Sequence, residues 1–313
     1  MDLSVIIVNW NTKGLLLQCL TSVYERIAGR GMEVFVVDNG SRDGSNEAVQ
    51  ETFPNVKLIR NQKNLGFAMA NNKALCLSKG KYLLLLNPDT QVKEGAIEKL
   101  ISFMDTHPDT GIAGAQMLNS DGSKQNSIAN FPSLATELLN KRLLRWLFPK
   151  KFPGKEKNYS DPIEVDSVIG ACMMVKRDAM EQVGFLNEDY FLFLEETDWC
   201  YRMKQASWKV YHVPQAEIIH FQGKTANFVK EKAKIEYYRS LYLFFEKHRG
   251  GIQSMILKTL LFIRFSMDFI IAVLSCLFTL FMQERSKRRL LIYGRLVYWH
   301  FRFCPDGMGL REN

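Results

Sequence analysis

Short runs of apolar residues alternate with segments of helical periodicity over the first 118 residues. The runs are LSVIIVN, MEVFVVD, NVKLIRN and KYLLLLN, at residues 3–9, 32–38, 55–61 and 81–87. Between them, residues 14–27 and 68–78 carry apolar positions at helical spacing. Apolar runs without polar alternation are typical of parallel strands covered on both faces, so this half of the chain predicts an α/β fold with crossover helices.

Polar residues end these runs, at Asn9, Asp38, Asn61 and Asp89. The carboxyl ends of parallel strands meet at one edge of a sheet, and ligands collect there. In the fourth run, Pro88 cannot donate to a sheet ladder, so the strand stops and presents Asp89 just beyond its end. At that place Asp89 is either a turn residue or a ligand.

The middle of the chain, residues 119–166, is polar and irregular and contains the basic stretch KRLLRWLFPKKFPGKEK at residues 141–157. Its cations predict either a solvated loop or a contact with an acceptor or a membrane surface. Regular structure is expected again from VDSVIGACMMVKRDAM, residues 165–180, a strand that enters a helix. It continues through residues 208–213 and a helix over residues 229–248.

A different composition begins at Ile252. Residues 265–282 contain Asp268 as their one charged residue and approach the lower length limit of a membrane span. The cationic, aromatic stretch of residues 283–302 that follows has the composition expected at a lipid headgroup layer. The C-terminal region is therefore expected to be a membrane-embedded or interfacial anchor, or alternatively a buried helical hairpin.

Composition narrows the picture only modestly. The 313 residues are 47% hydrophobic and 24% charged, which is ordinary for a globular protein, and the net charge of +8 suits an anionic partner without identifying it. The six cysteines are scattered without a CxxC pair, so we expect neither a zinc site nor a disulfide framework. This cysteine usage predicts a protein in a reducing compartment. The N-terminus lacks the features of a signal peptide, which predicts a cytoplasmic main domain.

Two segments near the predicted strand ends are suited to ligand binding. In VVDNGSRDGS, residues 36–45, Asp38 could accept from a nucleotide base or a ribose hydroxyl, or it could simply close an Asx turn. In NLGFAMANN, residues 64–72, a helix opens with glycine among amides and could face a phosphate or a sugar, although simple capping explains it equally well.

The stretch FLFLEETDWCYR, residues 191–202, places an acidic group after an apolar run. Glu195 and Glu196 near apolar walls would have the raised proton affinity of a general base, whereas Asp198 and Arg202 have the spacing of a helix salt bridge. His220 ends another strand-like run, and a lone histidine there is as readily structural as functional.

Together these segments resemble the family 2 glycosyltransferases with a GT-A fold, in particular the bacterial rhamnosyltransferase-like branch. The resemblance runs from about residue 3 to residue 249 and rests on seven motifs in the family's order. These are VIIVNWN, VVDNGSRDGS, NLGFAMANN, LLLNPDT, GACMMVKRDAM, GFLNEDYFLFLEETDWCYR and HFQGKT. The implied fold is a Rossmann-like, mostly parallel central sheet flanked by helices, followed by a C-terminal helical, membrane-associated segment.

The resemblance also implies roles for individual residues. Asn87-Pro88-Asp89 is similar to the family's DXD motif, so Asp89 and His220 are expected to hold Mg²⁺ or Mn²⁺. Glu196, the second residue of the acidic pair, is expected to be the catalytic base, supported by Glu195 and Asp198, although aspartate is more usual at its position. The nucleotide-sugar would contact Asn9, Asp38, Asn64, Gly66, Asn72, Asn87 and Asp89. The acceptor would contact Gly170, Trp199 and Arg202.

The implied activity is inverting, metal-dependent sugar transfer in cell-surface polysaccharide synthesis, from a nucleotide-sugar to a saccharide or lipid-linked acceptor. The resemblance favours dTDP-rhamnose as donor, then a UDP-sugar. Residues 1–250 would form the transferase domain, with donor binding in about 1–118 and acceptor binding and catalysis in about 165–250. Residues 251–313 would attach it to the cytoplasmic face of the bacterial inner membrane, and no nucleic-acid partner is expected. The alternatives are a sugar nucleotidyltransferase and an inactive, membrane-bound carbohydrate-binding protein.

Overall fold

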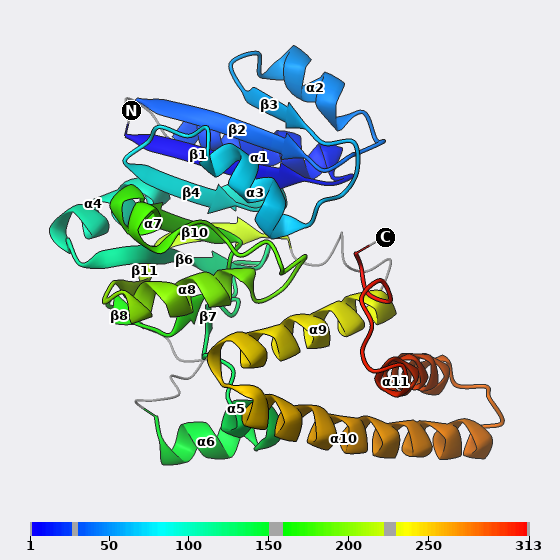
Figure 1. Ribbon diagram of the computed structural model, residues 1–313. Coiled ribbons are helices and arrows are strands. Elements are labelled where there is room, and N and C mark those ends of the chain that lie inside the picture. The colour runs from blue at the N-terminus through cyan, green and yellow to red at the C-terminus, as the bar shows by residue number, and fades with distance from the viewer. Residues whose placement is uncertain (1, 27–30, 150–158, 222–229, 312–313) are drawn as a thin grey trace. The chain divides into compact units, whose positions relative to one another are not determined.

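The computed structural model describes residues 2–26, 31–149, 159–221 and 230–311 (Figure 1). The chain falls into two compact units. Unit 1 comprises residues 1–131, 145–190 and 195–225, and unit 2 comprises residues 132–144, 191–194 and 226–313. The helix at residues 230–248 thus groups with the C-terminal helices, whereas the sequence prediction placed it in the transferase domain.

Unit 1 is built on a nine-stranded sheet in the order β3-β2-β1-β4-β10-β6-β11-β5, with β8 also paired to β11. Neighbours from β3 to β4 are parallel, and so are β6 and β11, whereas β10 is antiparallel to both strands beside it. The strands are β1 Leu3–Asn9, β2 Met32–Asp38, β3 Lys57–Arg60, β4 Tyr82–Leu86, β5 Thr90–Val92, β6 Thr110–Leu118, β8 Ile163–Glu164, β10 Cys172–Lys176 and β11 Lys209–His220. A separate pair is formed by β7 Ile128–Ala129 and β9 Ser167–Val168.

Helices cover both faces of this sheet, as the uninterrupted apolar runs predict. Alternate residues of β1, β2 and β4 point to opposite sides: Val5 and Leu84 belong to the core under α1, α2 and α4, whereas Ile6 and Leu85 belong to the core under α3, α7 and α8. The helices of unit 1 are α1 Lys13–Arg26, α2 Ser45–Thr52, α3 Phe67–Leu75, α4 Ala96–Thr106, α7 Arg177–Val183 and α8 Glu195–Gln205.

The irregular middle of the chain contains short elements. Besides β7 and β8, these include α5 Leu134–Leu138 and α6 Lys141–Leu147. Residues 150–157 of the basic stretch lie outside the described residues, as do residues 222–225 of the HFQGKT motif and residue 229 of the predicted helix.

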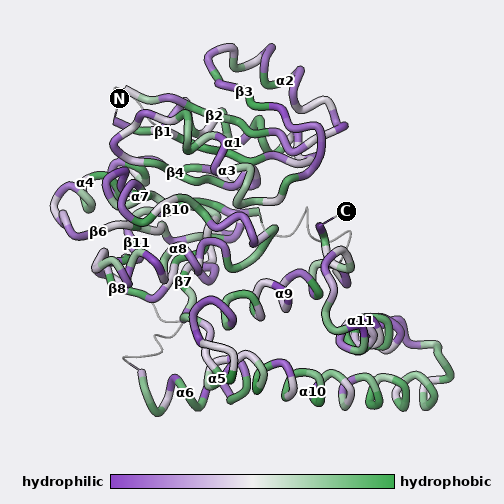
Figure 2. The backbone as a smooth tube through the Cα atoms, viewed as in Figure 1, coloured by the Kyte–Doolittle hydropathy of each residue, from purple (hydrophilic) through white to green (hydrophobic). Residues whose placement is uncertain are grey.

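Unit 2 is dominated by three helices, α9 Lys230–His248, α10 Gly251–Phe278 and α11 Glu284–Phe301. Helices α10 and α11 form an antiparallel hairpin: Ser275 Oγ lies 2.9 Å from Ser286 Oγ near the turn, and the Phe262 and His300 rings stack at 5.5 Å toward the other end. Tyr238 of α9 packs edge-on against Phe265 of α10 at 4.7 Å. Figure 2 shows α10 as hydrophobic over most of its length.

Candidate functional site

The strand ends of β1 and β2 form a rigid polar edge. Asn9 and Asp38 are register partners, and Asn9 Nδ2 donates to Asp38 Oδ1 at 3.0 Å. Asp38 Oδ2 accepts from the Ser41 backbone N–H at 2.9 Å and from Asn46 Nδ2 at 3.1 Å. The Asp38 side chain is buried. The turn-closing role that the sequence left open is therefore present, and it fixes the carboxylate at the sheet edge.

The start of α3 is held to this edge by an amide network. Asn39 Nδ2 donates to Gly66 O at 3.0 Å and to Asn64 Oδ1 at 3.2 Å, and the Gly66 N–H donates to Asn64 Oδ1 at 2.9 Å. Gly66 has a φ of 83°, a left-handed backbone that glycine adopts without strain. Asn64 and Gly66 therefore shape the turn into α3, and their predicted contact with the donor stays a prediction.

The segment Asn87-Pro88-Asp89 forms the turn between β4 and β5. Thr90 Oγ1 donates to Asn87 O at 2.7 Å, and Cys19 Sγ lies 3.6 Å from the same oxygen. Burial raises the pKa of the Cys19 and Cys172 thiols to about 12, so both remain neutral beneath the turn. The turn therefore has an uncharged floor, and Asp89 is its one acidic residue.

Asp89 and His220 meet although 131 positions separate them in the sequence. The β5–β11 pairing sets His220 opposite Thr90, and the Phe221 N–H donates to Asp89 O at 2.9 Å. As a result, His220 Nε2 lies 3.4 Å from Asp89 Oδ1, with both side chains buried. A carboxylate oxygen from the β4–β5 turn and an imidazole nitrogen from the end of β11 therefore converge here.

Gln125, which the sequence analysis did not single out, orients His220. Gln125 Nε2 donates to His220 O at 2.6 Å and to Asn119 Oδ1 at 2.7 Å, so its Oε1 is the atom that faces His220 Nδ1, at 3.1 Å. An acceptor at that place favours the Nδ1–H tautomer. In neutral His220, the lone pair of Nε2 then faces Asp89.

The Asp89–His220 pair has the spacing of two ligands of one divalent cation. Adjacent ligands of an octahedral Mg²⁺ lie about 3 Å apart, close to the distance between Asp89 Oδ1 and His220 Nε2. The described residues contain no group of three or more His, Cys, Asp or Glu side chains able to enclose a metal. Two protein ligands leave coordination positions for phosphates and water, which is how substrate-bound Mg²⁺ is usually held.

Gly170 and Ala171 connect Glu196 to the turn formed by Asn87-Pro88-Asp89. The Asn87 N–H donates to Ala171 O at 3.0 Å, so residues 170–171 run next to the turn. A Cβ on Gly170 would lie 3.5 Å from Glu196 Cβ and 3.9 Å from the Phe67 ring. The predicted base, the predicted acceptor residue Gly170 and the DXD-like turn therefore occupy one region of unit 1.

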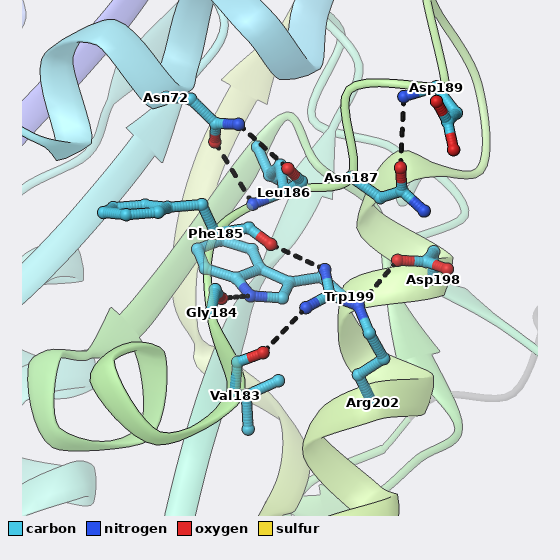
Figure 3. A network of polar contacts seen from close by, with 10 residues as sticks. All are labelled: Asn72, Val183, Gly184, Phe185, Leu186, Asn187, Asp189, Asp198, Trp199 and Arg202. Atoms are coloured by element: carbon cyan, nitrogen blue, oxygen red, sulfur yellow. Dashed lines mark hydrogen bonds and ion pairs between the residues drawn. The ribbon is translucent and has the colours of Figure 1, made fainter.

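Helix α8, which carries Glu195 and Glu196, is anchored by a buried polar network (Figure 3). Arg202 Nε donates to Asp198 Oδ2 at 2.8 Å, and its terminal nitrogens donate to Val183 O and Phe185 O. Trp199 Nε1 donates to Gly184 O at 2.8 Å. These side chains satisfy carbonyls at the C-terminal end of α7, which would otherwise lack partners.

The other side of the loop after α7 is held by α3. Asn72 Nδ2 donates to Leu186 O at 2.8 Å, and Asn72 Oδ1 accepts from the Leu186 N–H at 3.1 Å. Trp199 and Asp198 are fully buried. The contacts of Asn72, Asp198, Trp199 and Arg202 therefore hold α3, α8 and the loop after α7 together. Their predicted roles in donor binding, catalysis and acceptor binding stay predictions.

Two residues with left-handed backbone precede α8. Phe193 and Leu194 have φ values of 71° and 66°, which cost non-glycine residues of order 1 kcal/mol or more each. This strained turn delivers the chain directly into Glu195, the first residue of α8. Strain of this kind concentrates at functional sites, where the surrounding structure compensates for it.

A mostly parallel central sheet with helices on both faces and polar residues at its strand ends is the architecture of the GT-A fold. A mannosyltransferase from Pyrobaculum calidifontis, solved with GDP-Man and Mn²⁺, has the same fold. Its TM-score is 0.57 at 16% identity, over 96% of this chain and 86% of that one. The chain belongs to glycosyl transferase family 2, since the model of that family matches residues 4–184.

Two relatives are similar over most of the transferase region. The N-acetylglucosaminyl-diphospho-decaprenol L-rhamnosyltransferase of Mycobacterium tuberculosis is 28% identical over 247 residues, which is 74% of this chain and 80% of the relative. The low-salt glycan biosynthesis hexosyltransferase Agl10 of Haloferax volcanii is 30% identical over 228 residues, 71% of this chain and 67% of the relative. These findings confirm the family, the rhamnosyltransferase-like resemblance and the GT-A fold predicted from the motifs.

Proposed function

We propose that this family 2 enzyme transfers a sugar, with inversion at the anomeric carbon and with Mg²⁺ or Mn²⁺, from a nucleoside diphosphate to a saccharide or lipid-linked acceptor. The observation that carries the proposal is the 3.4 Å approach of His220 Nε2 to Asp89 Oδ1 at the strand-end edge of the sheet. The same edge holds the buried carboxylate of Asp38.

Each residue of the edge has a distinct task. Asp38 and Asn9 bind and orient the nucleoside, since a buried carboxylate accepts strongly from base N–H and ribose hydroxyl groups. Asp89 and His220 would hold the divalent ion, which would supply positive charge to the departing nucleoside diphosphate. Asn87 keeps the turn in register through its bond to Ala171.

Glu196 accepts the proton of the acceptor hydroxyl as that oxygen attacks the anomeric carbon. One bond forms to the acceptor oxygen while the bond to the diphosphate oxygen breaks on the opposite face, so the configuration inverts in a single displacement. The positive end of the α8 dipole favours carboxylates in the first turn, where Glu195 and Glu196 lie. The neighbouring Gly170 leaves space beside Glu196 that a side chain would fill.

The relatives guide the choice of substrates. The mycobacterial relative is named as a rhamnosyltransferase acting on a decaprenol-linked sugar, which supports dTDP-rhamnose and a lipid-linked acceptor. The Haloferax relative is named only as a hexosyltransferase, which leaves other hexose donors open. A UDP-sugar is the second choice because the motif resemblance implies it. A lipid-linked acceptor also supports attachment to the cytoplasmic face of the membrane through the C-terminal helices.

A donor screen tests the proposal. Purified full-length protein is incubated with dTDP-rhamnose and UDP-sugars, with Mg²⁺, with Mn²⁺ or with EDTA, and the released nucleotide is identified. We expect nucleoside diphosphate from one donor, only with metal present. Undiminished release in EDTA would overturn the metal assignment, and free pyrophosphate as product would indicate a nucleotidyltransferase instead.

A further inference from the structure

Helix α10 has one continuous apolar face that no described residue covers. The exposed side chains recur at helical spacing along its whole length. They are Ile252, Met255, Ile256, Leu260, Ile263, Met267, Ile270, Ile271, Leu274, Leu277 and Phe278. With 3.6 residues per turn they share an arc of about 160°, and no charged residue of α10 falls within it. We call these eleven side chains the apolar stripe of α10.

The opposite face of α10 packs inside unit 2. Its buried residues are Ser254, Leu257, Leu261, Phe265, Ala272 and Cys276. Tyr238 of α9 packs against Phe265 on this face. Helix α11 contributes His300, whose ring centroid lies 5.4 Å from that of Phe265, and Ser286, which pairs with Ser275. Helix α10 is therefore buried on one side only, and just 22% of its most apolar 18-residue window is buried.

By length and composition alone, α10 is able to cross a membrane. The hairpin with α11 argues against that orientation. Because α11 runs antiparallel along α10, a membrane-spanning α10 would carry α11 to the same depth. Helix α11 contains the cations Arg285, Lys287, Arg288, Arg289 and Arg295. Five cations at membrane depth are strongly unfavourable, and ion pairs reach only some of them: Arg295 with Glu231 at 2.7 Å, Lys287 with Glu284 at 2.9 Å and, more loosely, Arg289 with Asp268 at 4.0 Å.

We infer that α10 lies in the plane of the bilayer, with its apolar stripe in the acyl region of an anionic membrane surface and the cations of α11 among the headgroups. The inference rests on the membrane attachment included in the proposed function and specifies how it is achieved. Interfacial helices bury their apolar face by about 5–10 Å, and the axes of packed helices are about 8–10 Å apart. With α10 at the acyl boundary, α11 therefore lies at the depth of the headgroups.

A lipid surface suits the stripe better than a second copy of the chain does. The stripe is about 42 Å long, as expected for 28 helical residues, and polar side chains do not interrupt its centre line. Arg285, Arg288 and Arg289 at the start of α11 are exposed, which provides charge complementarity to acidic headgroups. Tyr298, also exposed, has the amphipathic ring typical of the interface.

Vesicle binding tests the stripe. The full-length double variant Ile263→Glu, Leu274→Glu changes two exposed residues, so folding should be unaffected. We expect its partitioning onto phosphatidylcholine–phosphatidylglycerol vesicles to fall at least about tenfold, whereas the control Leu77→Glu, at an exposed leucine of unit 1, should bind like the wild type. Unchanged vesicle binding, or a change in oligomeric state alone, would overturn the inference.

Labelling separates a flat from a spanning helix. Gln283 lies in the α10–α11 turn and is exposed, so Gln283→Cys in a Cys76→Ser, Cys304→Ser background is tested with an impermeant maleimide in bacterial membranes. A flat α10 predicts reaction in inverted vesicles, the side on which the wild-type Cys76 of unit 1 reacts. Reaction only from the opposite side would establish a spanning helix. Donor turnover by the stripe variants reports separately on the proposed chemistry.

Discussion

Gln125 contacts His220 at both its backbone and its ring. Its Nε2 donates to His220 O at 2.6 Å, and its Oε1 lies 3.1 Å from His220 Nδ1. The first contact fixes which way the amide points, and the second fixes the tautomer of the imidazole. In the proposed function, Gln125 would therefore position His220 Nε2 for the metal without being a ligand itself.

Gln125→Leu is expected to weaken Mn²⁺-dependent binding of nucleoside diphosphate by about 10- to 100-fold, because His220 loses the acceptor that orients its ring. Nucleotide binding without metal should be unchanged. Calorimetry measures both affinities, and ¹⁵N shifts report the His220 tautomer. The control is Gln91→Leu, an exposed glutamine on β5. An unchanged tautomer in Gln125→Leu would contradict the positioning role.

Asp89→Asn keeps the shape of the turn but removes the charge opposite His220. We expect metal-dependent turnover of the donor to fall more than about 100-fold, because an uncharged amide is a poor ligand for a hard cation. Glu94→Gln, at a side chain that is 90% exposed and nearby in sequence, is the matched control. Electron paramagnetic resonance of Mn²⁺ with nucleoside diphosphate checks binding directly, and a wild-type spectrum from Asp89→Asn would exclude Asp89 as a ligand.

Asp38→Asn puts an NH₂ group in place of one of the two carboxylate oxygens. Oδ1 accepts from Asn9, and Oδ2 accepts from the Ser41 backbone N–H and from Asn46. Either way a donor then faces a donor, so the free energy of unfolding should fall by about 1–3 kcal/mol. Nucleotide affinity should fall as well. Asn46→Ala removes one donor to the same carboxylate and leaves its charge, so it should lower stability without lowering nucleotide affinity. Equal affinity losses in both variants would point to folding rather than recognition.

His212 makes stability depend on pH. Its pKa is lowered to about 4, from 6.5 in an exposed histidine, chiefly because burial disfavours the charged ring; the nearby Lys124 acts in the same direction and a hydrogen bond with the Gly114 backbone opposes it. The unfolded chain therefore binds a proton that the folded chain resists, and the protein should lose up to about 3 kcal/mol of stability as the pH falls from 6.5 to 4. His212→Gln should flatten that part of the profile, measured by urea unfolding followed with tryptophan fluorescence. A profile as steep as the wild type's would rule out His212 as the cause.

The sequence predicts the part of the sheet formed by β1, β2 and β4 well because its signals are local. Uninterrupted apolar runs ending in a polar residue identify β1, β2 and β4, and parallel pairing alone then sets Asn9 opposite Asp38. The antiparallel insertion of β10 between β4 and β6 is not readable, since an apolar run does not reveal its direction.

Gln125 escapes sequence reasoning for a different reason. It lies in a polar stretch without periodicity, and its partner is 95 positions away. The Asp198–Arg202 pair was predicted from its spacing, but the use of Arg202 to satisfy carbonyls after α7 was not, because those carbonyls carry no sequence signal. Hydrogen bonds between a side chain and a distant backbone group are therefore the part of this site that the sequence does not predict.

Glu196 is the residue whose role is tested most directly by a conservative change. Glu196→Gln keeps the volume and the packing against Gly170 but removes the basic oxygen. Donor and metal affinity should therefore survive, while sugar transfer in a single turnover falls by about 10²- to 10⁴-fold, the usual cost of losing a general base.

The neighbouring Glu195→Gln is the matched control, because the two residues are adjacent in the first turn of α8. Glu195 is buried, whereas Glu196 is partly accessible, so only Glu196 is able to reach an acceptor hydroxyl without rearrangement. Glu195→Gln should lower the transfer step less than Glu196→Gln does. Wild-type transfer by Glu196→Gln would remove Glu196 as the base, and a selective loss in Glu195→Gln would assign that role to Glu195.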